Sequence, residues 1–153
     1  KVIMKFKINI IILVLLFSIS FSCSSDDRDN TNTQEQNITG NWKPYAYEYK
    51  GKIYTVDECD KKGQLLINND MSGVYEKYMM SSGSCINISS YSGNWTYDKN
   101  TLTLTLSYKE NGVTKTLVKQ VENFSDSELR TVDNSMNLDS NPGNDEAILT
   151  WKK

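Results

Sequence analysis

The stretch from Thr101 to Tyr108 reads TLTLTLSY, and its regular alternation is the strongest indication of the fold class. Leu102, Leu104, Leu106 and Tyr108 fall on one side of an extended chain, and hydroxyl side chains fall on the other. A period of two in the apolar side chains predicts a β-strand that has one buried face and one solvent-exposed face. We therefore expect this stretch to be a strand at the centre of an all-β domain.

A hairpin and further strands follow from the residues on either side. Asn111 and Gly112 suit a two-residue turn with positive backbone angles, so residues 113–124 are expected to return as the next strand. Residues 57–62 have room for one turn of helix at most. Other runs bounded by Gly, Asn, Asp or Ser predict strands over 42–49, 52–56, 64–67, 73–80, 85–90, 93–97, 129–132 and 147–151.

Short strands joined by short turns predict an antiparallel, up-and-down meander β-barrel of eight or nine strands. Closure into a barrel removes the open edges that favour aggregation. A barrel of about eight strands is either filled by its own side chains or wide enough for one small ligand. The sequence leaves both outcomes open.

The first strand also leaves an alternative open. Tyr45, Tyr47 and Tyr49 share one face of a regular strand, opposite Trp42. If the alternation continues past Pro44, the tyrosines form an exposed strip outside a barrel that contains Trp42. If Pro44 marks a bulge, the phase changes and the tyrosines line the interior.

The amino-terminal residues have the pattern of a secretory signal. Lys5 and Lys7 precede an apolar run over 8–21, and small residues lead to Cys23. The run is shorter than the roughly 20 residues that a spanning helix needs. We therefore predict a cleaved signal peptide over 1–22 rather than a permanent transmembrane helix.

The segment from Cys23 to Asp27 reads CSSDD and resembles the signal of Bacteroidetes lipoproteins. The resemblance implies that Cys23 carries acyl chains and that the acidic residues after it direct export to the cell surface. It implies a protein that is lipid-anchored in the outer membrane. Residues 23–37 contain nothing that would anchor a core and predict a disordered linker, so the folded domain is expected over 38–153.

The two remaining cysteines predict a disulfide, and the net charge of the mature chain argues against one class of partner. With Cys23 acylated, Cys59 and Cys85 remain as a pair in an oxidising compartment, which predicts a disulfide. After removal of the signal, 14 basic residues face 19 acidic ones. This acidic balance argues against binding to nucleic acid. We also expect the protein to be a monomer.

Two Gly-x-Trp motifs point to a family. One opens the first strand at Gly40 to Trp42, and the other, Gly93 to Trp95, precedes the Leu and Thr strand. With Cys59, Cys85 and an aromatic residue plus lysines at the chain end, they resemble the lipocalin-like domain of Bacteroidetes lipoproteins. The resemblance implies a barrel whose closed end is plugged by Trp42. In lipocalins an arginine near the chain end packs on this tryptophan, a place open here to Lys152 or Lys153.

The residue types argue against catalysis. The chain contains no histidine, which removes the Ser-His-Asp and Cys-His arrangements and the commonest transition-metal ligand. The loop over 139–146 offers oxygen ligands for a hard cation, but turns favour the same residues, and we interpret it as a solvated turn. We predict no enzyme activity, no metal and no cofactor.

Two functions remain. In the first, the barrel binds a small or apolar ligand, and its lining residues are Trp42, Trp95, Leu102, Leu104, Leu106 and Leu117. In the second, these residues form a filled core, and the outer surface docks a protein partner or a glycan at the outer membrane. An interior void of roughly 300 Å³ or more would favour the first function.

Overall fold

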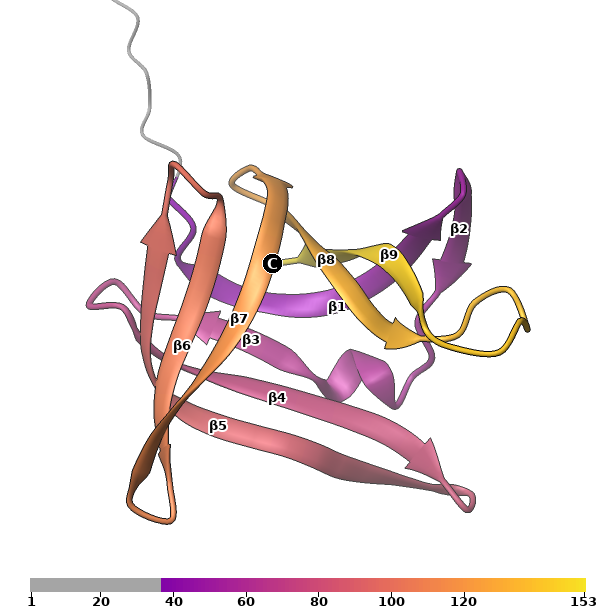
Figure 1. The fold of residues 1–153 in the computed structure, drawn as a ribbon, viewed down its shortest axis with the longest axis horizontal. Helices are drawn as coiled ribbons and strands as arrows, with labels where there is room; N and C mark the ends of the chain where they lie inside the picture. Colours follow the sequence, from indigo (N-terminus) through magenta and orange to yellow (C-terminus); the bar gives the residue numbers. More distant parts are fainter. Residues whose placement is uncertain (1–36) are drawn as a thin grey trace, which may run out of the picture. The chain divides into compact units, whose positions relative to one another are not determined.

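The computed structural model describes residues 37–153, and these residues form an all-β domain (Figure 1). The predicted signal peptide over 1–22, the acylated Cys23 and the linker up to residue 36 lie outside the described residues. The helical residues between 37 and 153 include no stretch with the length and apolar character needed to cross a membrane. The strands are β1 Gly40–Tyr49, β2 Lys52–Thr55, β3 Gln64–Ile67, β4 Ser72–Ser81, β5 Ser84–Asp98, β6 Thr103–Glu110, β7 Val113–Phe124, β8 Glu128–Met136 and β9 Asp145–Lys152, with a 3₁₀ turn, η1, at Asp60–Lys62.

The strands form a closed antiparallel barrel. Beginning at β3, each strand pairs with the next one in the sequence as far as β9, and β9 then pairs with β1. The ring is completed by β1 and β3, and β2 pairs only with β1 as an extra strand. The predicted meander barrel of eight or nine strands is therefore confirmed.

The barrel is closed at one end and divided at the other. At two seams the backbone pairing is short: β1 pairs with β3 only over Gly40–Trp42, and β7 pairs with β8 only between Val121 and Phe124. Beyond these pairs the strands diverge, and the β4–β5 and β6–β7 hairpins project from the barrel (Figure 1). We call the half around Trp42 the closed end and the half with the diverging strands the open end.

The closed end is filled by three tryptophans. Trp42, Trp95 and Trp151 are at most 2% exposed, and each indole N–H donates a hydrogen bond. The acceptors are the Ile38 carbonyl at 2.8 Å, the Leu66 carbonyl at 2.9 Å and the Thr131 hydroxyl at 2.9 Å. Because each polar indole atom has its partner, the large rings are buried without leaving a donor unsatisfied.

Lys153 covers the Trp42 plug. Its Nζ lies 4.3 Å from the centroid of the Trp42 ring, so Lys153 takes the place that the family resemblance left open between the two lysines. Its side chain passes over Gly40, where a Cβ would lie 2.3 Å from the Lys153 Cε. Gly40 also has a φ of +147°, which residues with a side chain rarely adopt. Glycine in this motif therefore leaves room for the lysine that covers the tryptophan.

Two expectations about the central strands are corrected. The predicted strands over 85–90 and 93–97 are one continuous strand, β5. Gly93 marks a close approach within the sheet rather than a turn, since a Cβ there would lie 2.0 Å from the Ser107 carbonyl oxygen. Leu102 was expected on the inner face, but it lies in the β5–β6 turn with a φ of +52° and is 40% exposed.

The bulge alternative for the first strand is confirmed. The register between β1 and β9 shifts between Pro44 and Ala46. Tyr45 therefore stays outside, where it is 55% exposed, whereas Tyr47 is buried and Tyr49 is half-buried. The exposed strip of three tyrosines does not form.

Candidate functional site

Most of the residues that were expected to line a ligand cavity are buried in the hydrophobic core. Trp42, Trp95, Leu104 and Leu106 are at most 1% exposed and belong to the buried core cluster, which also contains Tyr47 and Tyr75. Leu117 is half-buried toward the open end and packs against the edge of this cluster. The closed end therefore corresponds to the filled alternative, and a ligand site has to be sought at the open end.

A small cavity lies at the open end beneath η1. It measures about 20 Å³, which is room for about one water molecule and far below the interior void of roughly 300 Å³ that would favour a ligand inside the barrel. Its lining is mainly polar or aromatic: Pro44, Tyr47, Asp60, Gly63, Tyr75, Glu76, Lys77, Tyr78, Asp133, Leu149 and Trp151.

A buried ion pair crosses the β7–β8 seam where the backbone pairing has ended. Lys119 Nζ lies 2.8 Å from Asp133 Oδ2, and the two side chains are 10% and 4% exposed. Lys119 Nζ also lies 5.5 Å from the centroid of the Tyr75 ring. Side chains thus hold the two strands together beyond the last backbone pair, Val121 with Thr131.

A second set of contacts spans the open end from β4 to β8. Lys77 Nζ donates to the Ser135 hydroxyl at 2.6 Å, and this hydroxyl donates to Asp133 Oδ1. Among the described residues Lys77 has no carboxylate within ion-pair distance. The network joins two lysines, one aspartate and one serine across the mouth of the barrel.

Burial and ion pairing shift the pKa values of the ionisable groups in this network. Burial alone would raise the pKa of Asp133, but Lys119 and hydrogen bonds from Ser135 lower it overall. Burial would lower the pKa of Lys119, but Tyr75 and Asp133 raise it overall. Burial and the nearby Asp133 carboxylate raise the pKa of Tyr47 far above its ordinary value. The pair is therefore ionised at neutral pH, and Tyr47 keeps its proton.

Three stacked tyrosines form the inner wall of the open end. Tyr75, Tyr91 and Tyr108 come from neighbouring strands β4, β5 and β6, and we call them the tyrosine shelf. The ring centroids are 6.4 Å apart for Tyr75 and Tyr91 and 4.2 Å apart for Tyr91 and Tyr108. Tyr75 is buried, whereas Tyr91 and Tyr108 are half-buried, so the shelf runs from the core toward solvent.

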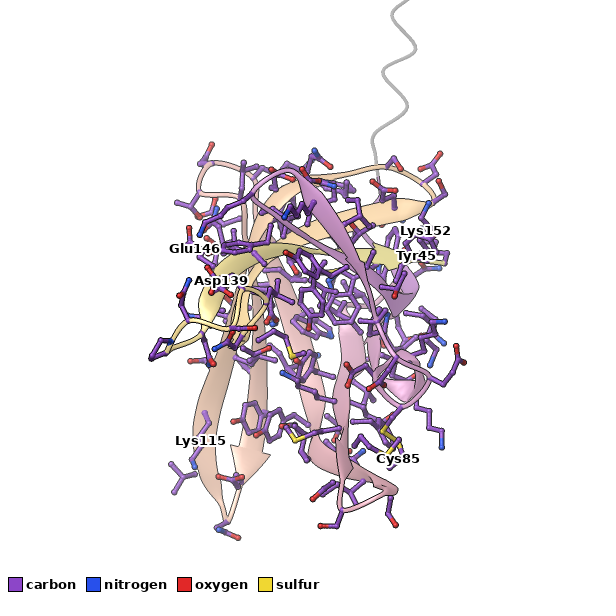
Figure 2. All side chains as sticks on the ribbon, turned by 90° about the vertical axis from the view of Figure 1, so that its right-hand side faces the viewer. Tyr45, Cys85, Lys115, Asp139, Glu146 and Lys152 are labelled. Carbon is purple, nitrogen blue, oxygen red and sulfur yellow. A yellow bond between two sulfur atoms is a disulfide. The ribbon has the colours of Figure 1, made fainter. Side chains whose placement is uncertain are left out.

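A disulfide fixes the outer part of the β4–β5 hairpin. The Sγ atoms of Cys59 and Cys85 are 1.97 Å apart, which confirms the predicted pairing. The bond ties the beginning of β5, next to the β4–β5 turn, to the segment before η1 (Figure 2). The wall that carries Tyr91 is thereby attached to the residues that cover the small cavity.

An outer groove offers a different surface. It measures about 400 Å³ and lies over β5, β6 and β7 at the Gly93 approach. It is lined by Ser92, Gly93, Asn94, Ser107, Tyr108, Lys109 and Thr114, whose side chains include hydroxyl, amide and ammonium groups.

In the acidic loop over 139–146, Asp139 makes its contacts within the chain. Asp139 accepts hydrogen bonds from the Tyr49 hydroxyl at 3.2 Å and from Lys50 Nζ at 3.1 Å. A backbone bond from Asn141 and the bond from Lys50 lower the pKa of Asp139 strongly. Between residues 37 and 153, no three His, Cys, Asp or Glu side chains are grouped to hold a metal ion.

These features define a class of protein. An antiparallel ring of eight strands, plugged by tryptophan at one end and open at the other, is a fold that holds small ligands in or at the mouth of a barrel. A family model described as a lipocalin-like domain matches residues 38–131, and the chain belongs to this family. No curated protein and no solved structure matches the chain.

Proposed function

We propose that this chain is a lipoprotein anchored in the outer membrane through Cys23, and that its barrel binds a small molecule at the open end without chemical turnover. The contrast between the two ends of the barrel supports this proposal. At the closed end, Trp42 and its neighbours are fully buried against one another. At the open end, the tyrosine shelf runs from Tyr75, beside the buried Lys119 and Asp133 pair, to the half-buried Tyr91 and Tyr108.

The chemistry of the open end favours a ligand that has both a ring and polar groups. The tyrosine shelf offers aromatic faces, and stacking on them removes apolar area from water, worth about 2.5 kcal/mol for each 100 Å². Lys77 and the tyrosine hydroxyls offer hydrogen bonds that fix the orientation of the ligand. The site differs from the lining predicted from sequence, which was mainly tryptophan and leucine.

A fluorescent probe tests the location. Anilinonaphthalene sulfonate combines aromatic rings with one anionic group, and we expect it to bind the native protein at the open end. Tyr91→Ala removes the middle of the tyrosine shelf and should weaken binding at least severalfold. The matched control is Tyr45→Ala, because Tyr45 lies on the outside of the barrel. Equal binding by both variants would contradict the proposed site.

The anchoring part of the proposal rests on the sequence alone. Lys5, Lys7, the apolar run over 8–21 and Cys23 follow the order of a lipoprotein signal. Two acidic residues, Asp26 and Asp27, follow closely, as in the surface-exported proteins that this segment resembles. Export to the cell surface would also supply the oxidising compartment in which the Cys59 and Cys85 bond persists.

A second candidate function rests on the outer groove. Its volume of about 400 Å³ and its hydroxyl and amide lining suit the hydroxyl groups of a glycan. Asn94→Ala would remove the one side-chain amide of this groove without touching the barrel interior. Binding of host surface polysaccharide that is lost in Asn94→Ala, and kept in Tyr91→Ala, would favour docking of a glycan over ligand binding at the open end.

A further inference from the structure

The outer half of β7 has an edge that no described strand covers. Along residues 113–120 β7 pairs with β6 on one side. On its other side, pairing with β8 begins only at Val121. The β6–β7 hairpin projects from the barrel at this point, so the edge lies beyond the end of the β7–β8 seam (Figure 1). A free edge of this kind is a ready template for another strand.

The alternation of the backbone shows which groups are free. The Val121 N–H donates to the Leu102 carbonyl, so the backbone groups of Val121 point toward the β6 side. Backbone groups alternate along a strand, so Thr114, Thr116 and Val118 direct theirs to the uncovered side. The side chains of these three residues are exposed, and all three are β-branched, which suits them to strand pairing.

We propose that this β7 edge pairs with the same edge of a second copy of the chain, antiparallel and centred on Thr116. In this register Thr116 faces Thr116 of the other copy, and Thr114 faces Val118. Both copies then present the same surface, as a two-fold symmetric dimer requires. The two outer sheets become one continuous sheet across the pair of molecules.

Charge selects this register. Moving the second copy by two residues in one direction places Lys115 opposite Lys115, and moving it in the other places Lys115 opposite Lys119. Like charges directly opposite each other destabilise a strand pair. Larger shifts bring the second copy against the Asn111 turn or against β8. Centring on Thr116 uses the whole free stretch and places Lys115 opposite Leu117.

Both lysines of the edge make an ion pair within their own chain. Lys115 pairs with Glu110 on the same hairpin, and Figure 2 shows Lys115 near the hairpin tip. Lys119 pairs with Asp133. Lysines on an edge strand usually discourage pairing, but in the register centred on Thr116 neither Lys115 nor Lys119 faces a lysine of the second copy. This proposal departs from the monomer expected from the sequence, which does not show where the β7–β8 pairing stops.

Cysteine crosslinking tests the pairing in the full chain. In a Cys23→Ser background, Thr116→Cys places one free thiol at the centre of the proposed pair. The facing Cα atoms would be about 5.5 Å apart, within the range of about 4.4–6.8 Å that a disulfide spans. The control is Ser107→Cys, because Ser107 faces Thr116 from β6 and is also exposed. Its two copies would lie about 14 Å apart, three strand spacings, which is too far for a disulfide.

We expect a disulfide-linked dimer from Thr116→Cys and only monomer from Ser107→Cys. A second experiment uses charge. Thr116→Glu and Thr116→Lys should each lower the dimer fraction in sedimentation equilibrium, and an equal mixture of the two should restore it. Crosslinking of both cysteine variants or of neither, or a charge mixture that stays monomeric, would overturn the proposal.

Discussion

Replacing Lys119 with Met will destabilise the protein because it leaves the Asp133 carboxylate buried without its counter-charge. Asp133 is only 4% exposed on its side chain, and removal of one partner of a buried pair typically costs about 3–5 kcal/mol. Asp133 keeps two hydrogen bonds from Ser135, so we expect the lower end, about 3 kcal/mol. In a domain of this size that corresponds to a fall in Tm of about 12 °C.

The double variant Lys119→Met with Asp133→Leu separates the energy of the pair from the energy of packing. Apolar side chains of similar volume often replace a buried ion pair with little net loss. We therefore expect the free energy of unfolding of the double variant to lie within about 1 kcal/mol of the native value. Urea unfolding of the native chain, both single variants and the double variant completes the cycle.

The pH dependence of the free energy of unfolding tests the Lys119 and Asp133 pair independently. In the native chain the pKa of Asp133 is below its usual 3.8, so its stabilisation is present at neutral pH and is lost as the pH falls below about 4. The pKa of Lys119 is above its usual 10.5, so its stabilisation is lost as the pH rises past about 10.5. In Lys119→Met, protonation of the unpaired Asp133 carboxyl group removes its buried charge. The loss in free energy of unfolding relative to the native chain should therefore become smaller at low pH. Single-variant losses that simply add in the double variant, with a deficit independent of pH, would refute this reasoning.

Three further changes test other parts of the structure. Trp42→Ala removes a fully buried ring and should cost about 3–5 kcal/mol in urea unfolding, and an unchanged midpoint would mean that Trp42 does not plug the barrel. Joint replacement of Cys59 and Cys85 by Ala should lower the free energy of unfolding by on the order of 3 kcal/mol. Circular dichroism should still show a β spectrum, and loss of that spectrum would contradict a fold that is stabilised mainly by its hydrophobic core. Cys23→Ser should release the protein from membranes on fractionation, and continued membrane association would rule out acylation at Cys23.

Most of the fold was predictable because side-chain alternation is a local property. The alternation from Thr103 to Tyr108 and the Asn111 turn correctly place the β6–β7 hairpin. Leu102 fits the same alternation, yet it lies in the turn, because a period of two does not show where a strand begins. Pro44 indicated a bulge as one alternative, but only the pairing with β9 decides the phase of Tyr47.

The open end was harder to predict because its groups come from distant parts of the chain. Lys119 stands between Leu117 and Val121 on the inner face of β7, and this phase alone could have identified it as a buried lysine. Its partner Asp133 is on the neighbouring strand, and no local pattern predicts where the backbone pairing between the strands ends. The tyrosine shelf likewise depends on the register of three strands.

The most direct test of ligand binding at the open end is an NMR titration of ¹⁵N-labelled protein with the molecule that co-purifies from its own host. Our account predicts shifts at the backbone amides of Tyr47, Tyr75 and Tyr91. The indole N–H signals of Trp42 and Trp95 should stay in place, because both bond to carbonyls in the filled end. Shifts of those indole signals with unchanged tyrosine amides would contradict the account.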